Sequence, residues 1–229
     1  MPSSNLPTRW RLIKFITNTP AKPIARLLLA HGAGAPANSD WMHTMASALC
    51  EQQIDVWRFN FGYMQRFCDS GKRSFPAKMP QLCQEYDAAL VQCPDDLPLI
   101  VAGKSMGGRV ASMLSHSAKV KAVCAFGYPF YPPGKDRHDK DALHKKPART
   151  AHFDVLTKPL WIFQGERDPF GNRQQLECKR WPAVQMFWLN DGDHDFKPRV
   201  KSGVTQQQLI LNVAALCRRK IDELRLEIK

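Results

Sequence analysis

One short motif carries the strongest chemical signal in the chain. Residues 101–109 read Val-Ala-Gly-Lys-Ser-Met-Gly-Gly-Arg, which contains a G-x-S-x-G pattern centred on Ser105. An apolar run precedes the motif and a helical pattern follows it, so the serine is expected on a sharp strand-to-helix turn that exposes its hydroxyl. Gly103 and Gly107 must then be small, because strand and helix approach each other closely there. This setting predicts that Ser105 is a nucleophile.

A serine nucleophile needs a base that takes its proton and an acid that orients the base. Asp168 and His194 each follow an apolar run of about strand length, so both are expected where a strand ends. Catalytic and ligand-binding groups collect at the carboxyl edge of an open parallel sheet. The sequence therefore predicts a triad of Ser105, His194 and Asp168, with Glu166 as the rival acid.

Each member of this set also has a plainer interpretation. Ser105 can cap the following helix, Asp168 can be a turn residue, and His194 can be an exposed loop histidine. Three aspartates surround the histidine in a D-x-D-x-D pattern that resembles part of a calcium loop. These aspartates are Asp191, Asp193 and Asp195. The histidine inside the pattern and the missing downstream glutamate argue against a metal site, so neither a metal nor a cofactor is expected.

Two backbone N–H groups are needed to stabilise the oxyanion of an acyl-transfer reaction. Met106 follows the nucleophile and supplies one of them. The second is expected from the loop after residues 26–30, where Ala33 is the preferred donor and Gly34 the rival. Hydrogen bonds of His31 are expected to orient this loop. The candidate walls of the substrate pocket are His31, Gly32, Gly34, Tyr63, Tyr128, Phe130 and Phe170.

The order of apolar runs and helical patterns predicts a mostly parallel, doubly wound sheet flanked by helices. Strands are expected at residues 10–17, 26–30, 56–61, 97–102, 120–126, 160–164 and 184–189. Helices are expected at residues 41–49, at 80–93, after Ser105 and at 209–224, the last preceded by a capping box of Thr205 and Gln208. Residues 62–78 are expected to form a loop, and 127–158 a small, lid-like excursion.

Length and composition are those of a soluble globular domain. The 229 residues suit one α/β domain spanning 1–229, with 44% hydrophobic and 24% charged residues. The N-terminal stretch lacks the apolar segment of a secretory signal, and no apolar run reaches membrane-spanning length. The seven cysteines are odd in number and widely spaced, which is typical of reduced thiols. A cytoplasmic protein that does not enter a membrane is expected.

The chain carries a formal net charge of +12. The densest cluster of basic residues is the Lys135–Arg149 segment, which aspartates interrupt. No nucleic-acid-binding motif accompanies it, so a solvated loop is expected and nucleic-acid binding is not. Lys104 and Arg109 beside the nucleophile are expected to be solvated as well, where they can attract an anionic substrate.

Taken together, the motifs resemble those of an α/β-hydrolase-like family. The family includes testis-expressed protein 30, the hydrolase-like domain of a nuclear histone-acetyltransferase complex subunit, and small bacterial members. The matching segments are Leu29–Ala35, Phe59–Phe61, Gly103–Arg109, Gly127–Pro129 and Gly165–Gly171. The resemblance implies an α/β-hydrolase fold, and it places Ser105, Asp168 and His194 at the triad positions. The short chain leaves room for only a small or minimal lid. Gly62 departs from the family pattern, in which a proline is expected near that position.

These features predict a serine hydrolase that cleaves an ester, thioester or related acyl bond of a small molecule through an acyl-enzyme. The alternative is a catalytically silent protein that keeps the fold as a scaffold or binding module. The chain order of serine, acid and histidine, together with the oxyanion loop, favours the enzyme. Esterases, thioesterases and peptidases share this machinery, and the sequence specifies neither the substrate nor the oligomeric state.

Overall fold

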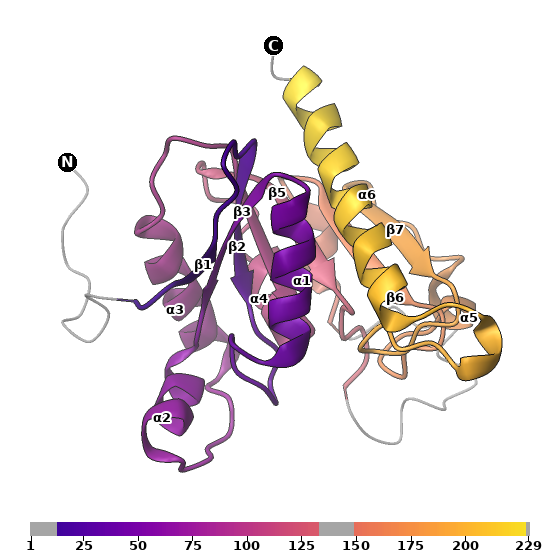
Figure 1. Cartoon of the computed structure of the whole chain (residues 1–229), viewed down its shortest axis with the longest axis horizontal. Coiled ribbons are helices and arrows are strands. Elements are labelled where there is room, and N and C mark those ends of the chain that lie inside the picture. Colours follow the sequence, from indigo (N-terminus) through magenta and orange to yellow (C-terminus); the bar gives the residue numbers. More distant parts are fainter. Residues whose placement is uncertain (1–12, 133–148, 228–229) are drawn as a thin grey trace.

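A seven-stranded sheet forms the centre of the structure, a computed structural model that describes residues 13–132 and 149–227 (Figure 1). In chain order the strands are β1 (Ile16–Asn18), β2 (Ala25–Ala30), β3 (Ile54–Phe59), β4 (Leu99–Lys104), β5 (Val120–Phe126), β6 (Leu160–Gly165) and β7 (Val184–Leu189). Their order across the sheet is β1-β3-β2-β4-β5-β6-β7. Only β1 runs antiparallel to its neighbour, so the carboxyl ends of the other six meet at one edge.

Helices cover both faces of this sheet (Figure 1). Helices α1 (Asp40–Glu51) and α6 (Gln206–Glu227) pack on one face, and α3 (Met79–Val91) and α4 (Met106–Ser112) on the other. The remaining helices are α2 (Gly62–Ser70), α5 (Arg173–Leu176) and short 3-10 turns at Ala151–Val155 and Val200–Ser202. Within residues 13–132 and 149–227, no helix combines the length and apolar character needed to cross a membrane.

The alternation of side chains along the strands produces two separate cores. On β2, Leu28 and Ala30 contribute to the core under α3 and α4, whereas Leu27 and Leu29 contribute to the core under α1 and α6. Both faces of the central strands are therefore apolar, which is typical of a parallel sheet covered on two sides. The predicted α/β fold class is confirmed.

Most predicted elements are present within a few residues of their expected bounds. The capping box is confirmed, because the Thr205 amide donates to Gln208 Oε1 (2.8 Å) and the Gln208 amide donates to Thr205 Oγ1 (3.2 Å). The first strand is shorter than expected and begins at Ile16, while residues 10–12 of the expected strand lie outside the described residues.

The expectation of a continuous loop over residues 62–78 is wrong in its first half, where α2 forms. Tyr63 and Met64 are buried, and Phe67 packs against the same core one turn later. Gly71 then ends the helix in the left-handed region at a φ of 70°, which glycine adopts without steric cost. Polar and charged residues between the apolar ones hide this short amphipathic pattern in the sequence.

The expected lid-like excursion at 127–158 is described only at its two ends. Residues 133–148, and with them nearly all of the Lys135–Arg149 segment, lie outside the described residues. The described ends contribute to the core, because Tyr128, Phe130 and Phe153 are at most 1% exposed. These three residues therefore belong to the body of the protein.

Candidate active site

Ser105 occupies a sharp, strained turn between β4 and α4. Its φ of 51° and ψ of −116° lie where residues other than glycine rarely occur, at a cost of about 1–3 kcal/mol. The flanking glycines make the turn possible. A Cβ added to Gly103 would lie 2.1 Å from the carbonyl carbon of Gly107, and one added to Gly107 would lie 2.6 Å from the carbonyl oxygens of Ala30 and His31. The local sequence thus holds the Ser105 side chain at the sheet's carboxyl edge.

The three residues predicted as a triad lie within hydrogen-bond distance of one another. His194 Nε2 is 2.9 Å from Ser105 Oγ, and His194 Nδ1 is 2.8 Å from Asp168 Oδ2. Asp168 is fully buried, whereas the His194 side chain remains 18% exposed. The rival acid Glu166 points elsewhere and pairs with Arg173 at 2.6 Å. The arrangement has the connectivity that nucleophile activation requires, from hydroxyl through imidazole to carboxylate.

A buried glutamine that the sequence analysis did not single out orients the carboxylate. Gln164 Nε2 donates to Asp168 Oδ2 (2.9 Å) and to the Gly171 carbonyl (3.1 Å), while its Oε1 accepts from the Tyr128 amide (2.8 Å). The Phe170 amide donates to the other carboxylate oxygen at 2.8 Å. These bonds fix the plane of the Asp168 carboxylate. The available signal was a lone polar residue near the end of an otherwise apolar strand.

The expectation that Lys104 and Arg109 are solvated is wrong for Lys104. This lysine is 6% exposed, and its ammonium donates to the His194 carbonyl (2.7 Å) and pairs with Asp195 (3.0 Å) over the ring of Trp41. Burial lowers its pKa from the ordinary value, and the Asp195 carboxylate opposes that effect. Lys104 therefore anchors the backbone of the loop that carries His194. Arg109 is half-buried.

The three aspartates around His194 stabilise the loop that carries this histidine, and their carboxylates do not converge on one point. Asp191 pairs with Arg199 and with Arg167, and the Arg199 guanidinium lowers the pKa of Asp191 to about 2. Asp193 accepts two backbone amides of the following turn, and Asp195 pairs with the buried lysine described above. In the part of the chain that the structure describes, no group of three or more potential ligands is arranged to hold a metal ion.

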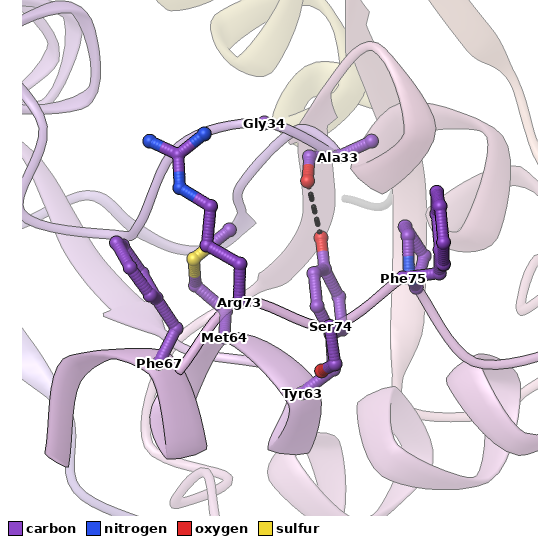
Figure 2. Close-up of a pocket in the computed structure, with 9 residues that line it drawn as sticks. Ala33, Gly34, Tyr63, Met64, Phe67, Arg73, Ser74 and Phe75 are labelled. Carbon is purple, nitrogen blue, oxygen red and sulfur yellow. Dashed lines mark hydrogen bonds between the residues drawn. The ribbon is translucent and has the colours of Figure 1, made fainter. Parts of the chain in front are cut away.

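In the loop after β2, the carbonyl groups of Gly32 and Ala33 accept hydrogen bonds from neighbouring side chains. Phe61 donates its amide to His31 Nε2 (3.0 Å), so the proton of the neutral ring is on Nδ1, which donates to the Gly32 carbonyl (2.6 Å). Tyr63 donates its hydroxyl to the Ala33 carbonyl at 2.9 Å (Figure 2). Because the C=O and N–H of a trans peptide point in opposite directions, the Ala33 and Gly34 amides are turned away from these partners.

The first turn of α4 offers the other amide expected of an oxyanion hole. Met106 is the first residue of this helix, and amides in a first helical turn have no acceptor within the helix. The loop after β2 lies close to the serine, because a Cβ added to Gly32 would be 3.6 Å from Ser105 Cβ. Two segments with available N–H groups therefore flank Ser105.

A hollow of about 320 Å³ opens at Ser105, and some of the predicted pocket residues line it. Gly32, Gly34 and Phe170 are among them, and the Phe170 ring lies 4.6 Å from the His194 ring. The other candidates lie elsewhere. Tyr63 lines a neighbouring hollow, His31 lies buried behind the loop, and Tyr128 and Phe130 are fully buried in the core under α3 and α4.

A second Ser–His contact in the structure has a different character. Ser112 Oγ lies 2.8 Å from His152 Nε2, but Ser112 is fully buried and donates its own proton to the Arg109 carbonyl at 2.8 Å. Its hydroxyl must then accept from the histidine, which is the reverse of what general-base activation requires. Burial also lowers the pKa of His152 to about 4. We interpret this pair as a packing contact.

The buried His31 makes the stability of the protein depend on pH. Burial lowers its pKa to about 4, compared with 6.5 for a free histidine. The unfolded chain therefore binds a proton between pH 6.5 and pH 4 that the folded protein excludes, so stability is retained above pH 6.5 and is lost as the pH falls. We expect His31 to contribute a loss of about 2 kcal/mol in the free energy of unfolding between pH 7 and pH 5.

Urea denaturation of wild type and His31→Gln at both pH values measures this loss. The variant should show a smaller decrease than wild type, because glutamine does not titrate. His152 contributes with the same sign in both proteins and cancels in the comparison. Equal decreases in the two proteins would show that His31 is not the titrating group.

The family of the chain follows from comparison with known proteins. Residues 23–222 match the family described as "Alpha/beta hydrolase domain", so the chain belongs to this α/β-hydrolase family. The seven-stranded sheet and the strand–serine–helix turn are consistent with that assignment. No curated protein sequence matches the chain.

Solved structures of α/β hydrolases share the fold. An alpha-beta serine hydrolase homologue from Coxiella burnetii is 16% identical with a TM-score of 0.64, and the match covers 91% of each chain. Dienelactone hydrolase from Anabaena variabilis is 19% identical with a TM-score of 0.63, covering 90% of this chain and 89% of that one. A serine hydrolase without a lid from Xanthomonas campestris is 14% identical with a TM-score of 0.61, covering 92% and 88%.

Proposed function

We propose that the protein is a serine hydrolase that cleaves an ester, thioester or related acyl bond with Ser105, His194 and Asp168 as its catalytic triad. The observation that carries the proposal is the continuous pair of hydrogen bonds from Ser105 Oγ to His194 Nε2 (2.9 Å) and from His194 Nδ1 to Asp168 Oδ2 (2.8 Å). The strained turn beneath the serine supports it, because such strain at a functional position is retained only when the surrounding structure enforces it.

In the first half of the reaction, His194 Nε2 takes the proton of Ser105 as the oxygen attacks the substrate carbonyl carbon. The Met106 and Ala33 amides donate to the oxyanion that forms, and one such donor contributes about 3–4 kcal/mol in a well-studied protease. The carbonyl then re-forms and the bond to the leaving group breaks. His194 gives its proton to the leaving group, and the acyl group stays on Ser105.

In the second half, a water molecule takes the place of the leaving group. His194 removes one proton from the water as its oxygen attacks the acyl carbon. The bond to Ser105 Oγ breaks, the serine recovers its proton from His194, and the carboxylic acid departs. Asp168 stays ionised throughout and holds the imidazole in the tautomer that exposes Nε2 to Ser105.

The proteins of similar structure described above support the proposed hydrolase chemistry. The Coxiella burnetii and Xanthomonas campestris proteins are described as serine hydrolases, and the Anabaena variabilis protein as a dienelactone hydrolase. Within the family, we propose that the chain groups with the small bacterial relatives of testis-expressed protein 30, on the motifs around residues 29–35, 103–109 and 165–171.

A fluorescent fluorophosphonate tests the proposal directly. An activated serine oxygen displaces fluoride from phosphorus and becomes covalently labelled, independently of the natural substrate. Wild type should label within minutes, and Ser105→Ala and His194→Ala should not. Ser112→Ala and His152→Ala are matched controls from the second Ser–His contact, and both should label like wild type.

Two results would overturn the proposal. Absence of labelling in folded wild type would favour the silent scaffold or binding protein, since the serine would then lack activation. Loss of labelling in Ser112→Ala with retention in Ser105→Ala would move the nucleophile to the other pair. Thermal melting of each variant establishes that the protein is folded.

A further inference from the structure

A second hollow of about 370 Å³ lies beside the candidate active site. Figure 2 shows the residues that line it. Helix α2 forms one wall, and the segment of residues 73–76 that follows it forms another. Ala33 and Gly34 line this hollow and also the hollow at Ser105. The loop that offers the oxyanion amides is therefore common to both.

Gly34, which lines both hollows, borders open space. A Cβ added to this residue would meet no described atom within 4 Å. His194 lines the hollow at Ser105 and is absent from the residues around the second hollow. Since His194 must protonate the leaving group, the leaving group belongs near His194. The acyl part of a bound substrate is then the part that extends past Gly34.

The lining of the second hollow is apolar with one cation. Tyr63, Met64, Phe67 and Phe75 are among its apolar lining residues. Tyr63 is tied to the Ala33 carbonyl, so its ring is a fixed wall. In Figure 2, Arg73 rises beside Phe67 and Met64, while Phe75 lies on the opposite side of Tyr63.

Arg73 is the group in this hollow that can recognise a charge. Its guanidinium carbon lies 5.3 Å from the centre of the Phe67 ring, a geometry that restrains a cation without neutralising it. The side chain is exposed, and no carboxylate of residues 13–132 or 149–227 forms a salt bridge with it. A planar guanidinium binds a carboxylate through two parallel hydrogen bonds.

We propose that this second hollow is the acyl pocket and that it selects acyl groups with an apolar chain ending in a carboxylate. The substrates would be half-esters or half-thioesters of dicarboxylic acids, whose far carboxylate binds Arg73 while the ester carbonyl reaches Ser105. This inference rests on the proposed function. The chain's net charge of +12 favours the approach of such anions.

Two esters of equal chain length test the selectivity. They are the 4-nitrophenyl half-ester of adipic acid and 4-nitrophenyl hexanoate, and the measured quantity is the ratio of their kcat/KM values. We expect the ratio of adipate half-ester to hexanoate to be about fivefold higher in wild type than in Arg73→Ala, and to recover partly in Arg73→Lys. In wild type this ratio should decline as salt is added, because salt screens the attraction between Arg73 and the carboxylate. Lys72→Ala removes the neighbouring exposed cation, which does not line the hollow, and should keep the wild-type ratio.

A second variant tests the shape of the pocket independently of charge. Ser74 is exposed and lines the hollow, so Ser74→Trp fills the space without disturbing the core. We expect the ratio of hexanoate to acetate hydrolysis to fall about tenfold in this variant, because a blocked pocket discriminates by chain length.

Failure of this inference is distinguishable from failure of the proposed function. If wild type reacts with the fluorophosphonate but both ratios are unchanged in the variants, the acyl-pocket assignment is wrong and the serine hydrolase remains. Equal loss of the adipate preference in Lys72→Ala would show general attraction by surface charge and would also overturn the role of Arg73. If wild type neither labels nor hydrolyses any ester, both proposals fail together.

Discussion

Asp168→Asn should lower kcat about 10⁴-fold, as the corresponding change does in the protease triad where it was measured. An asparagine amide group can donate a hydrogen bond to His194 Nδ1, which then carries no proton. The proton moves to Nε2, the atom that lies 2.9 Å from Ser105 Oγ. In that tautomer the Nε2 atom has no lone pair for the serine proton, so nucleophile activation is lost.

The matched control for this prediction is Glu166→Gln. Both acids lie in the loop after β6, but Glu166 pairs with Arg173 and does not contact His194. Its replacement should change kcat by less than about threefold, as expected for loss of a partly exposed ion pair that does not include His194. Initial rates with a 4-nitrophenyl ester measure both variants. A large loss in Glu166→Gln together with a small one in Asp168→Asn would assign the acid to Glu166.

Gly103→Ala should prevent stable folding. The added methyl group would lie 2.1 Å from the carbonyl carbon of Gly107, and the contacted atoms are backbone that no side-chain rotation can clear. Relief would require β4 and α4 to separate, which would open the core on that face. We expect a loss of more than about 4 kcal/mol in the free energy of unfolding, because severe steric or core defects cause losses of this size.

Gly34→Ala supplies the matched control, because a Cβ at that position meets nothing within 4 Å. Its free energy of unfolding should stay within about 0.5 kcal/mol of wild type. Urea denaturation followed by circular dichroism compares the two variants. A folded Gly103→Ala protein with wild-type stability would contradict the close approach of strand and helix at the elbow.

Features that depend on neighbouring residues along the chain could be predicted from the sequence. Strand and helix periodicity reflects which face of a segment is buried, so the order of elements and the fold class could be predicted. Ser105 directly follows β4, and Asp168 and His194 lie in the loops that follow β6 and β7. Since parallel strands end at one edge, their convergence followed from topology without knowledge of any distance.

Features that depend on residues far apart in the chain could not be predicted in this way, because the folded structure brings those residues together. Asp168 and Glu166 are two residues apart and chemically equivalent, and only the position of His194 relative to β6 separates them. The burial of Lys104 is stabilised by His194, ninety residues later, which supplies a carbonyl for its ammonium, and by Asp195, which supplies a carboxylate. A local pattern contains no information about such a partner.

The residues that line the two hollows also could not be predicted from local sequence patterns. Tyr128 and Phe130 are plausible pocket residues by type and place in the chain, yet both are fully buried and both pack against the ring of Phe153. Arg73 gave no signal in the sequence. It lines the second hollow only because α2 forms and Gly71 turns the chain back toward the loop after β2. Register and chain direction set these contacts, and both are properties of the folded chain as a whole.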